Sequence, residues 1–193
     1  MNNDFDLDYS QNAGGIRETH PPRTVDGARQ SRSPRPRFLE MLNATKVSRH
    51  GILCLISALE MHGVIRDVRS EPIWIALPSK ARVSTKLPEN VRVVRFSDAA
   101  LRMGIQEVTV RGHGTIKTFS QAKSIVDCFK FRNTLQRELE LDLPELIGHL
   151  QSMVGAYGRR TITTVEAIRQ YLPACRMSNV MSPYLLALEH KKE

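Results

Sequence analysis

The residue types that carry most enzyme chemistry occur in this 193-residue chain only as isolated members. The segment 112–114 (Gly-His-Gly) lacks the third glycine and the strand-to-helix context of a phosphate-binding loop. Ser57 lies inside an apolar run, and not in the Gly-x-Ser-x-Gly turn that exposes a nucleophile. Asp67, Glu71 and Asp98 are too scattered to predict the paired carboxylates of a metal nuclease or glycosidase. We therefore expect no catalytic residue, no cofactor and no metal site, and hence a protein that is not an enzyme.

The cysteines point to packing and not to chemistry. Cys54, Cys128 and Cys175 are odd in number and far apart, without a Cys-x-x-Cys pair or Cys/His ligand spacing. Neither a disulfide framework nor a zinc site follows from this pattern. All three lie in apolar surroundings, where free cysteine usually packs as a small hydrophobic residue. The sequence predicts three reduced core cysteines.

Positive charge is concentrated in the middle of the chain. The formal net charge is +8, and between Arg66 and Arg132 the sequence has 13 basic and six acidic residues, which gives +7. Such a balance favours an acidic partner, either nucleic acid or an acidic protein face. A solvated basic surface without a partner is the alternative. Arg92 and Arg95 are expected on opposite faces of a strand, because strand side chains alternate.

One long apolar stretch is expected to form the centre of the fold. The segment 50–65 is apolar almost all round, which predicts a buried core helix. Ser48 is a suitable N-cap and Gly63 a suitable stop. At this length the segment is too short to cross a bilayer, which requires about 20 apolar residues.

The remaining patterns alternate between strands and helices. Strands are predicted at 73–77 (closed by Pro78), 91–96, 106–110 and 115–119, the last two forming a hairpin. Helices are predicted at 38–47, 98–102 (capped by Ser97), 120–131, 134–140, 144–153, 164–172 (ended by Pro173) and 177–190. This order indicates an α+β fold with a mixed or antiparallel sheet of about four to five strands and a helical C-terminal third.

The first 37 residues have a different composition. They are rich in Asn, Asp, Gly, Pro, Ser and Arg, with isolated apolar residues at no regular period. Such a segment buries too little apolar surface to offset the entropy of ordering, so we expect a disordered tail at 1–37 and one domain at 38–193. The tail is either solvated or an arm that contacts nucleic acid or a partner. Its acidic, polar start is unlike a signal peptide, so a cytoplasmic protein without a membrane partner is expected.

Five segments, taken in order, carry a resemblance to a known family. HGILCLISALEMHGV, EPIWIALP, VRVVRFS, GIQEVTVRGHGTIKTFSQAKSIVDCFKFRN and RMSNVMSPYLLALE resemble the C-terminal domain of AbiEi-type antitoxins, over about residues 40 to 190. These proteins are the antitoxin halves of abortive-infection type IV toxin–antitoxin systems. Family members join an N-terminal winged helix-turn-helix, which binds their own promoter, to this antitoxin domain. Their partner is a nucleotidyltransferase-like toxin. Here residues 1–37, which are expected to be disordered, stand in place of the winged helix-turn-helix, so this chain is expected to lack the usual promoter-binding domain.

The resemblance also points to particular positions. Those that match the family are Ser57, Ala58, His62, Gly63, Trp74, Pro78, Arg95, Asp127, Phe129, Arg132, Pro183 and Tyr184. Trp74 and Phe129 are expected in the core. For Arg95, Asp127 and Arg132 the resemblance implies a functional polar role, with a structural ion pair as the alternative.

These observations lead to one main hypothesis and one alternative. The main hypothesis is an antitoxin-like protein of a transcriptional-regulator family that neutralises a cognate nucleotidyltransferase-type toxin. The alternative is a nucleic-acid-binding regulator that acts through its basic surface. The partner-binding candidates are Arg92, Arg95, Lys117, Lys123, Asp127, Lys130 and Arg132.

Overall fold

The computed structural model describes residues 10–11, 36–48, 50–65, 72–139 and 165–190. The chain divides into two compact units, residues 1–120 and 121–193. The prediction of a single domain over residues 38–193 stays a prediction. The predicted disordered tail lies almost wholly outside the described residues, except that Ser10 and Gln11 form a short strand and a helix begins at Pro36.

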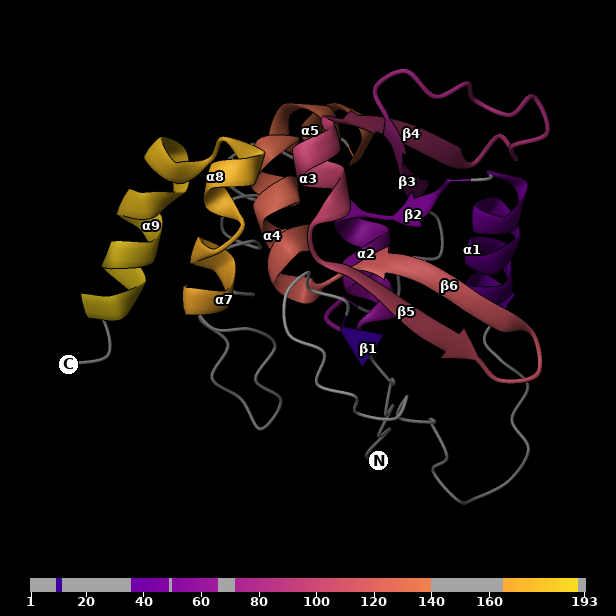
Figure 1. The fold of residues 1–193 in the computed structure, drawn as a ribbon, viewed down its shortest axis with the longest axis horizontal. Coiled ribbons are helices and arrows are strands. Elements are labelled where there is room, and N and C mark those ends of the chain that lie inside the picture. Colours follow the sequence, from indigo (N-terminus) through magenta and orange to yellow (C-terminus); the bar gives the residue numbers. More distant parts are fainter. Residues whose placement is uncertain (1–9, 12–35, 49, 66–71, 140–164, 191–193) are drawn as a thin grey trace. The chain divides into compact units, whose positions relative to one another are not determined.

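The first unit is built on a mixed six-stranded sheet (Figure 1). Its strands are β1 (Ser10–Gln11), β2 (Ile52–Leu53), β3 (Ile73–Pro78), β4 (Val91–Phe96), β5 (Ile105–Val110) and β6 (Gly114–Phe119). They lie in the order β1-β5-β6-β2-β3-β4. The β3–β4 and β2–β6 pairs are parallel, and the β1–β5, β5–β6 and β2–β3 pairs are antiparallel. The fold is α+β as predicted. The sequence also predicts the four long strands and their hairpin, but not the two strands of two residues.

The predicted core helix at 50–65 is divided between a strand and a helix. Ile52 and Leu53 form β2, and the helix α2 runs over Leu55–Met61. The backbone of Leu53 pairs with Ile75 on one side and Thr118 on the other, so this strand bridges the two halves of the sheet. A residue with positive φ follows at Leu55 (φ 51°), where the chain turns into α2. Cys54, and not Ser48, is therefore the N-cap. The expectation of a buried helix is confirmed, because six of its seven residues are buried.

One core cluster lies between the sheet and the helix α1 (Pro36–Val47). Met41, Leu42 and Ala44 are the buried residues of α1. They join side chains from β2 to β6, among them Leu53, Ile75, Leu77, Val91, Val108, Val110 and Ile116. On β6, Ile116 belongs to this cluster, whereas Thr115 and Lys117 are exposed on the other face, as strand alternation requires. The short helix α3 (Asp98–Arg102) contacts β3.

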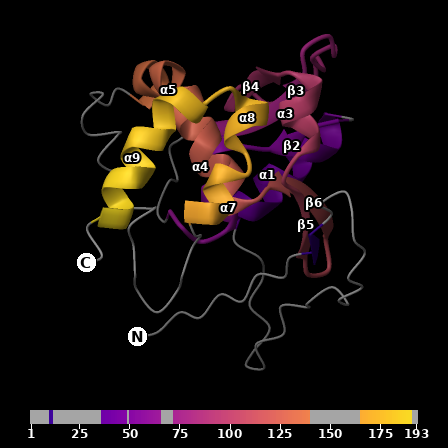
Figure 2. The same cartoon turned by 60° about the vertical axis from the view of Figure 1, so that its left-hand side comes forward.

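The second unit is helical. It contains α4 (Gln121–Lys130), α5 (Arg132–Leu139), α7 (Val165–Arg169), α8 (Leu172–Cys175) and α9 (Ser178–His190). The helix α4 contacts α5, α7 and α8, and α9 contacts α7 and α8 (Figure 2). The single helix predicted at 164–172 is in fact two short helices, and Pro173 lies in the first turn of α8 and does not end a helix. A proline is tolerated there because the first turn has no intrahelical acceptor for its missing N–H. The helix predicted at 144–153 lies outside the described residues.

Candidate functional site

The first pair of candidates, Lys123 and Asp127, is buried. Both side chains on α4 are 0 % exposed, and Lys123 Nζ lies 2.5 Å from Asp127 Oδ2. Burial raises the pKa of Asp127, and the ammonium of Lys123 opposes this rise. Their prediction as surface residues for a partner is wrong, because neither is accessible. The alternative, a structural ion pair, matches this geometry.

The same carboxylate links α4 to α8. Cys175 lies with its thiol 3.6 Å from Asp127 Oδ1, a distance at which sulfur can donate. Burial raises the pKa of Cys175 to about 11 and that of Cys128 well above its usual value. A thiol in this state is a poor nucleophile, because the thiolate is the reactive form. All three cysteines are buried and free, as the sequence predicts.

Two further positions from the family resemblance are also built into the core. Ser57 Oγ accepts a hydrogen bond of 2.9 Å from the backbone amide of Trp74. His62 Nε2 lies 2.6 Å from the carbonyl oxygen of Phe119 and donates to it. Burial lowers the pKa of His62 to about 4, and the bond to Phe119 opposes this effect. Both side chains therefore connect α2 to the sheet.

The remaining basic candidates are bound to nearby backbone or lie at the surface. Arg95 donates to the carbonyl oxygens of Pro78 and Ala81, at 2.9 and 2.6 Å. These bonds fix the start of the loop at residues 79–90, and Arg92 donates at 2.7 Å to the carbonyl of Glu89 at its end. Arg92 and Arg95 are both exposed residues of β4. Their placement on opposite faces of the strand stays a prediction.

The three remaining candidates each contact one nearby residue of the chain. Lys117 Nζ is 4.0 Å from Glu107 Oε1 on the neighbouring strand, with both side chains more than half exposed. Lys130 Nζ lies 5.5 Å from the centre of the Phe131 ring. Arg132 donates to the carbonyl of Phe129 at 3.0 Å. The structure thus does not gather the seven candidates into one site.

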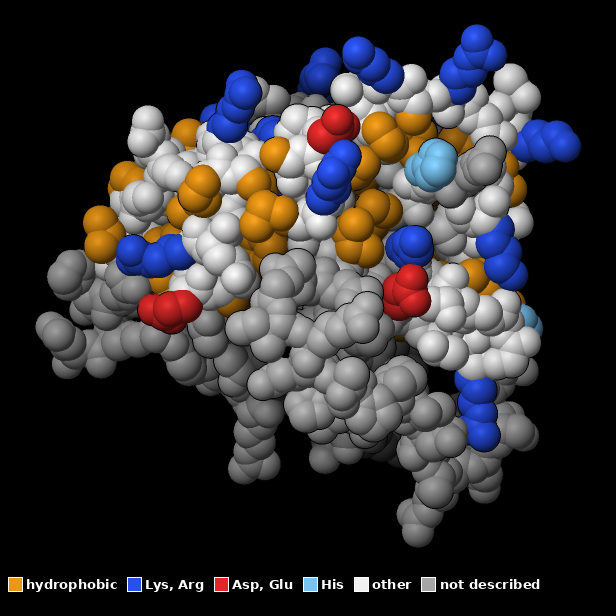
Figure 3. All heavy atoms as spheres, viewed as in Figure 1, with side chains coloured by type: hydrophobic (Ala, Val, Ile, Leu, Met, Phe, Trp, Pro, Cys, Tyr) orange, Lys and Arg blue, Asp and Glu red, His pale blue; other side chains and the backbone are white. Residues whose placement is uncertain are grey.

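The loop between β3 and β4 carries exposed positive charge on the first unit. Lys80, Arg82 and Lys86 are exposed on it, and we call these three residues the basic loop. Figure 3 shows basic side chains standing out along this edge of the molecule. The sequence predicts a polar, basic loop from Pro78 to Asn90 that carries Lys80, Arg82 and Lys86, although these three are not among the seven partner-binding candidates.

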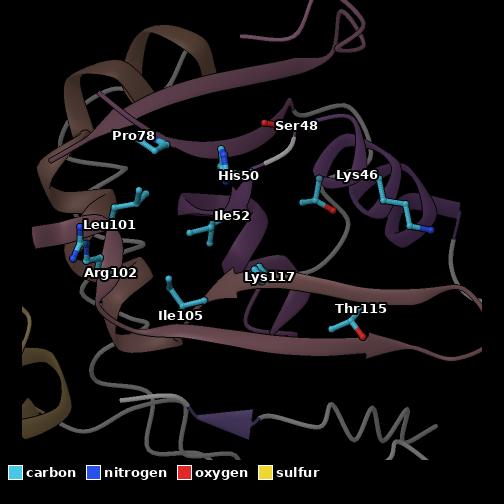
Figure 4. Close-up of a pocket in the computed structure, with 12 residues that line it drawn as sticks. Lys46, Ser48, His50, Ile52, Pro78, Leu101, Arg102, Ile105, Thr115 and Lys117 are labelled. Atoms are coloured by element: carbon cyan, nitrogen blue, oxygen red, sulfur yellow. The ribbon is translucent and has the colours of Figure 1, made fainter. Parts of the chain in front are cut away.

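A pocket opens on the first unit, between the end of α1, the turn before β2, α3 and the strands β5 and β6 (Figure 4). Its volume is about 380 Å³. It is lined by Thr45, Lys46, Ser48, His50, Gly51, Ile52, Pro78, Leu101, Arg102, Ile105, Thr115 and Lys117. The lining contains basic, hydroxyl and apolar side chains and no carboxylate. Of the residues predicted as candidates, only Lys117 belongs to it.

The turn before β2 shapes one wall of this pocket. The amide of Gly51 donates at 2.8 Å to the carbonyl of Ser48, which places His50 at the corner of the turn. A Cβ atom at Gly51 would lie 2.9 Å from Ser48 Cβ and 3.0 Å from Ile75 Cγ2. A glycine is therefore required here by close packing. The sequence could not reveal this pocket, because its walls come from residues up to 72 positions apart in the chain (Thr45 to Lys117).

Within the residues that the structure describes, no group of three or more His, Cys, Asp and Glu side chains could hold a metal ion. In the same residues no helix is both long and apolar enough to cross a membrane. No model of a known protein family matches the chain, and no curated protein matches it either.

Proposed function

We propose that this chain is an antitoxin-like protein that neutralises a nucleotidyltransferase-type toxin by binding it, and that it is not itself an enzyme. The observation that carries the proposal is the resemblance of five ordered segments to the antitoxin domain of AbiEi-type proteins. Four of these segments supply α2, β3, β4 and the β5–β6 hairpin with α4. The proposal therefore concerns residues that form most of the sheet of the first unit, α2, and α4 of the second unit.

The matched polar residues support a scaffold role. Ser57 and His62 bond to backbone groups of β3 and β6, and Arg95 bonds to the backbone at the end of β3 and beyond it. The bonds of Ser57 and His62 are buried and satisfy backbone polar groups inside the core, which is the usual function of a buried hydrogen bond. Those of Arg95 hold exposed backbone at the end of β3 and beyond it. We therefore expect that the toxin is bound by other, exposed side chains on the surface of this scaffold.

The basic loop is the surface that we assign to the toxin. Lys80, Arg82 and Lys86 are exposed, and Arg92 and Arg95 hold the two ends of the loop by bonds to its backbone. A loop held at both ends loses less conformational entropy on binding than a free one. Its charge is complementary to an acidic protein face, which speeds association and selects the partner.

Co-expression tests the proposal. The chain is produced together with a nucleotidyltransferase-type toxin, sought first in the gene next to its own, and cell growth is the readout. We expect the wild-type chain to restore growth and the triple variant K80Q/R82Q/K86Q to restore it poorly. The triple variant R111Q/R137Q/R169Q removes the same charge from exposed positions elsewhere and should behave as wild type. Absence of rescue by a folded wild-type chain overturns the proposal.

A second candidate function, binding of nucleic acid, is favoured by the same loop. Phosphate contacts by lysine and arginine make binding fall steeply with salt. A gel shift with double-stranded DNA at low and at physiological salt, run on wild type and on the basic-loop variant, tests it. Binding that weakens with salt and is lost in the variant supports this candidate. No shift even at low salt refutes it, and leaves the antitoxin proposal intact.

A further inference from the structure

The strand β4 lies at one end of the sheet order and, in the described part of the chain, pairs only with β3 (Figure 1). This pairing runs without a break from Val91 to Phe96. The strand contains neither a proline nor a bulge, two features with which proteins prevent another strand from adding to a sheet edge. Its outer edge therefore has the regular geometry that a further strand needs.

Two residues of β4 direct their backbone polar groups to this outer edge. The carbonyl of Asn90 accepts a bond of 2.8 Å from the first residue of β3, whereas the amide of Val91 donates at 3.0 Å to Pro88, outside the sheet. Successive residues of a strand direct their N–H and C=O groups to opposite edges, so Val93 and Arg95 face away from β3 as Val91 does. For these backbone groups no bond is found within the described residues. The edge thus offers two donors and two acceptors to an added strand.

The residues around this edge are mainly basic. Between residues 79 and 98 the chain has five basic and two acidic residues, a net charge of +3. Arg92 and Arg95 are exposed on β4 itself, and the basic loop leads into the strand. Pairing of two copies at this edge would bring two such regions together, which charge repulsion opposes, whereas an acidic strand is attracted. The charge therefore favours an acidic strand over a second copy of the chain.

We propose that the outer edge of β4 binds an extended segment of a partner protein that is rich in Asp and Glu, and that this segment adds to the sheet as a further strand. In this mode of binding the main-chain bonds, here to Val93 and Arg95, supply affinity, and side-chain contacts select the partner. Carboxylates of the added strand lie near Arg92 and the basic loop. The inference goes beyond the antitoxin proposal, because it does not require the partner to be a toxin, and either can fail without the other.

Fluorescence anisotropy on the full chain at low salt tests the proposal with three labelled peptides. The first alternates Glu and Val over six residues, and the second has Lys in place of Glu. The third has the sequence of the first with methylated backbone amides, so it keeps the charge but has no N–H donor. We expect the first peptide to bind at least about tenfold more tightly than the other two. Equal binding of the second or third peptide, or no binding of the first up to about 1 mM, overturns the proposal.

Variants locate the binding on β4. V93P removes an N–H that faces the outer edge and leaves the bonds to β3 in place, so it should weaken the acidic peptide by about tenfold. R92Q should weaken it by about three- to fivefold, the effect of one exposed charge pair. R111Q makes the same replacement at the hairpin turn and should change affinity less than about twofold. Equal weakening by R111Q and R92Q, or unchanged affinity in a folded V93P, overturns the proposal.

Amide hydrogen exchange provides a test on the wild-type chain that does not depend on how the variants fold. Saturation with the acidic peptide should slow exchange at the amides of Val93 and Arg95 by at least about tenfold, because both become hydrogen-bonded. The amide of Val94 faces β3 and should slow much less. Exchange at Val93 and Arg95 that stays unchanged while the peptide is bound overturns the proposal.

Discussion

His62 gives the sharpest prediction about the stability of this protein, because it is a titratable group held neutral inside the core. Its side chain is 8 % exposed, and its Nε2–H donates at 2.6 Å to the carbonyl of Phe119. Burial lowers its pKa from 6.5 to about 4. Protonation of the folded protein would place a positive charge in an almost fully buried site.

The sign and size of the effect follow from the two pKa values. Between pH 6.5 and about 4 the unfolded chain binds a proton at His62 that the folded chain does not, so the free energy of unfolding falls as the pH falls. The whole gap corresponds to about 3 kcal/mol. At pH 5 roughly 2 kcal/mol of it should already be lost relative to pH 7. Below pH 4 this contribution should fall no further.

Urea unfolding at pH 7 and pH 5 measures this directly. The chain has a single tryptophan, Trp74, which is 1 % exposed and so reports unfolding by its fluorescence. The variant H62Q keeps a side-chain N–H that can donate to Phe119 but has no titrating group. We expect H62Q to be less stable than wild type at pH 7 but to lose about 2 kcal/mol less on going to pH 5.

A matched control separates His62 from the other titrating groups. H50Q makes the same replacement at an exposed histidine and is the matched control. Carboxylates contribute equally to wild type and both variants and cancel in the comparison. The reasoning is refuted if wild type and H62Q lose the same stability between pH 7 and pH 5, or if H50Q flattens the profile.

Three further predictions concern other buried contacts. K123M should lower the free energy of unfolding by about 3 kcal/mol, because it removes the ammonium that pairs with the buried carboxylate of Asp127. Adding D127L should recover most of that loss in urea unfolding, and a double variant as unstable as the single one contradicts this. S57A removes the acceptor for the amide of Trp74 and should cost about 1–3 kcal/mol in thermal unfolding, so an unchanged midpoint would count against the bond. G51A places a Cβ atom 2.9 Å from the Cβ atom of Ser48 and should lower the free energy of unfolding by about 1–3 kcal/mol, measured by thermal melts followed by circular dichroism. A variant as stable as wild type would show that the turn can shift to make room for the extra carbon.

The local sequence pattern was sufficient to predict most of the strands and helices. The run at Ile73–Pro78, the partly alternating segment at Val91–Phe96 and the hairpin around Gly112 each form the strand that the sequence predicts. Hydrophobic period and turn residues act within a few positions of one another, so they can be read without knowing the fold. The burial of the three cysteines follows from the same apolar surroundings.

The error at residues 50–65 has a physical cause that the local pattern does not contain. A continuous apolar run is compatible with a buried helix and with a buried strand. Leu53 becomes a strand residue because Ile75 and Thr118 offer its backbone hydrogen-bond partners from 22 and 65 positions away. Only the pairing of these distant segments decides the choice, and it forces the turn with positive φ at Leu55.

The same distinction separates the candidate residues. The sequence by itself determined that the chain is basic, that Arg92 and Arg95 lie on a strand, and that Lys123 and Asp127 are one helical turn apart. Whether such a pair faces water or the interior is decided by what packs around the helix, and here both side chains are buried. The pocket of Arg102, His50 and Lys117 likewise exists only in the folded chain, because sheet pairing and the seating of α3 on β3 bring its walls together. Charge and period are properties of neighbours in sequence, whereas burial and pocket geometry are properties of neighbours in space.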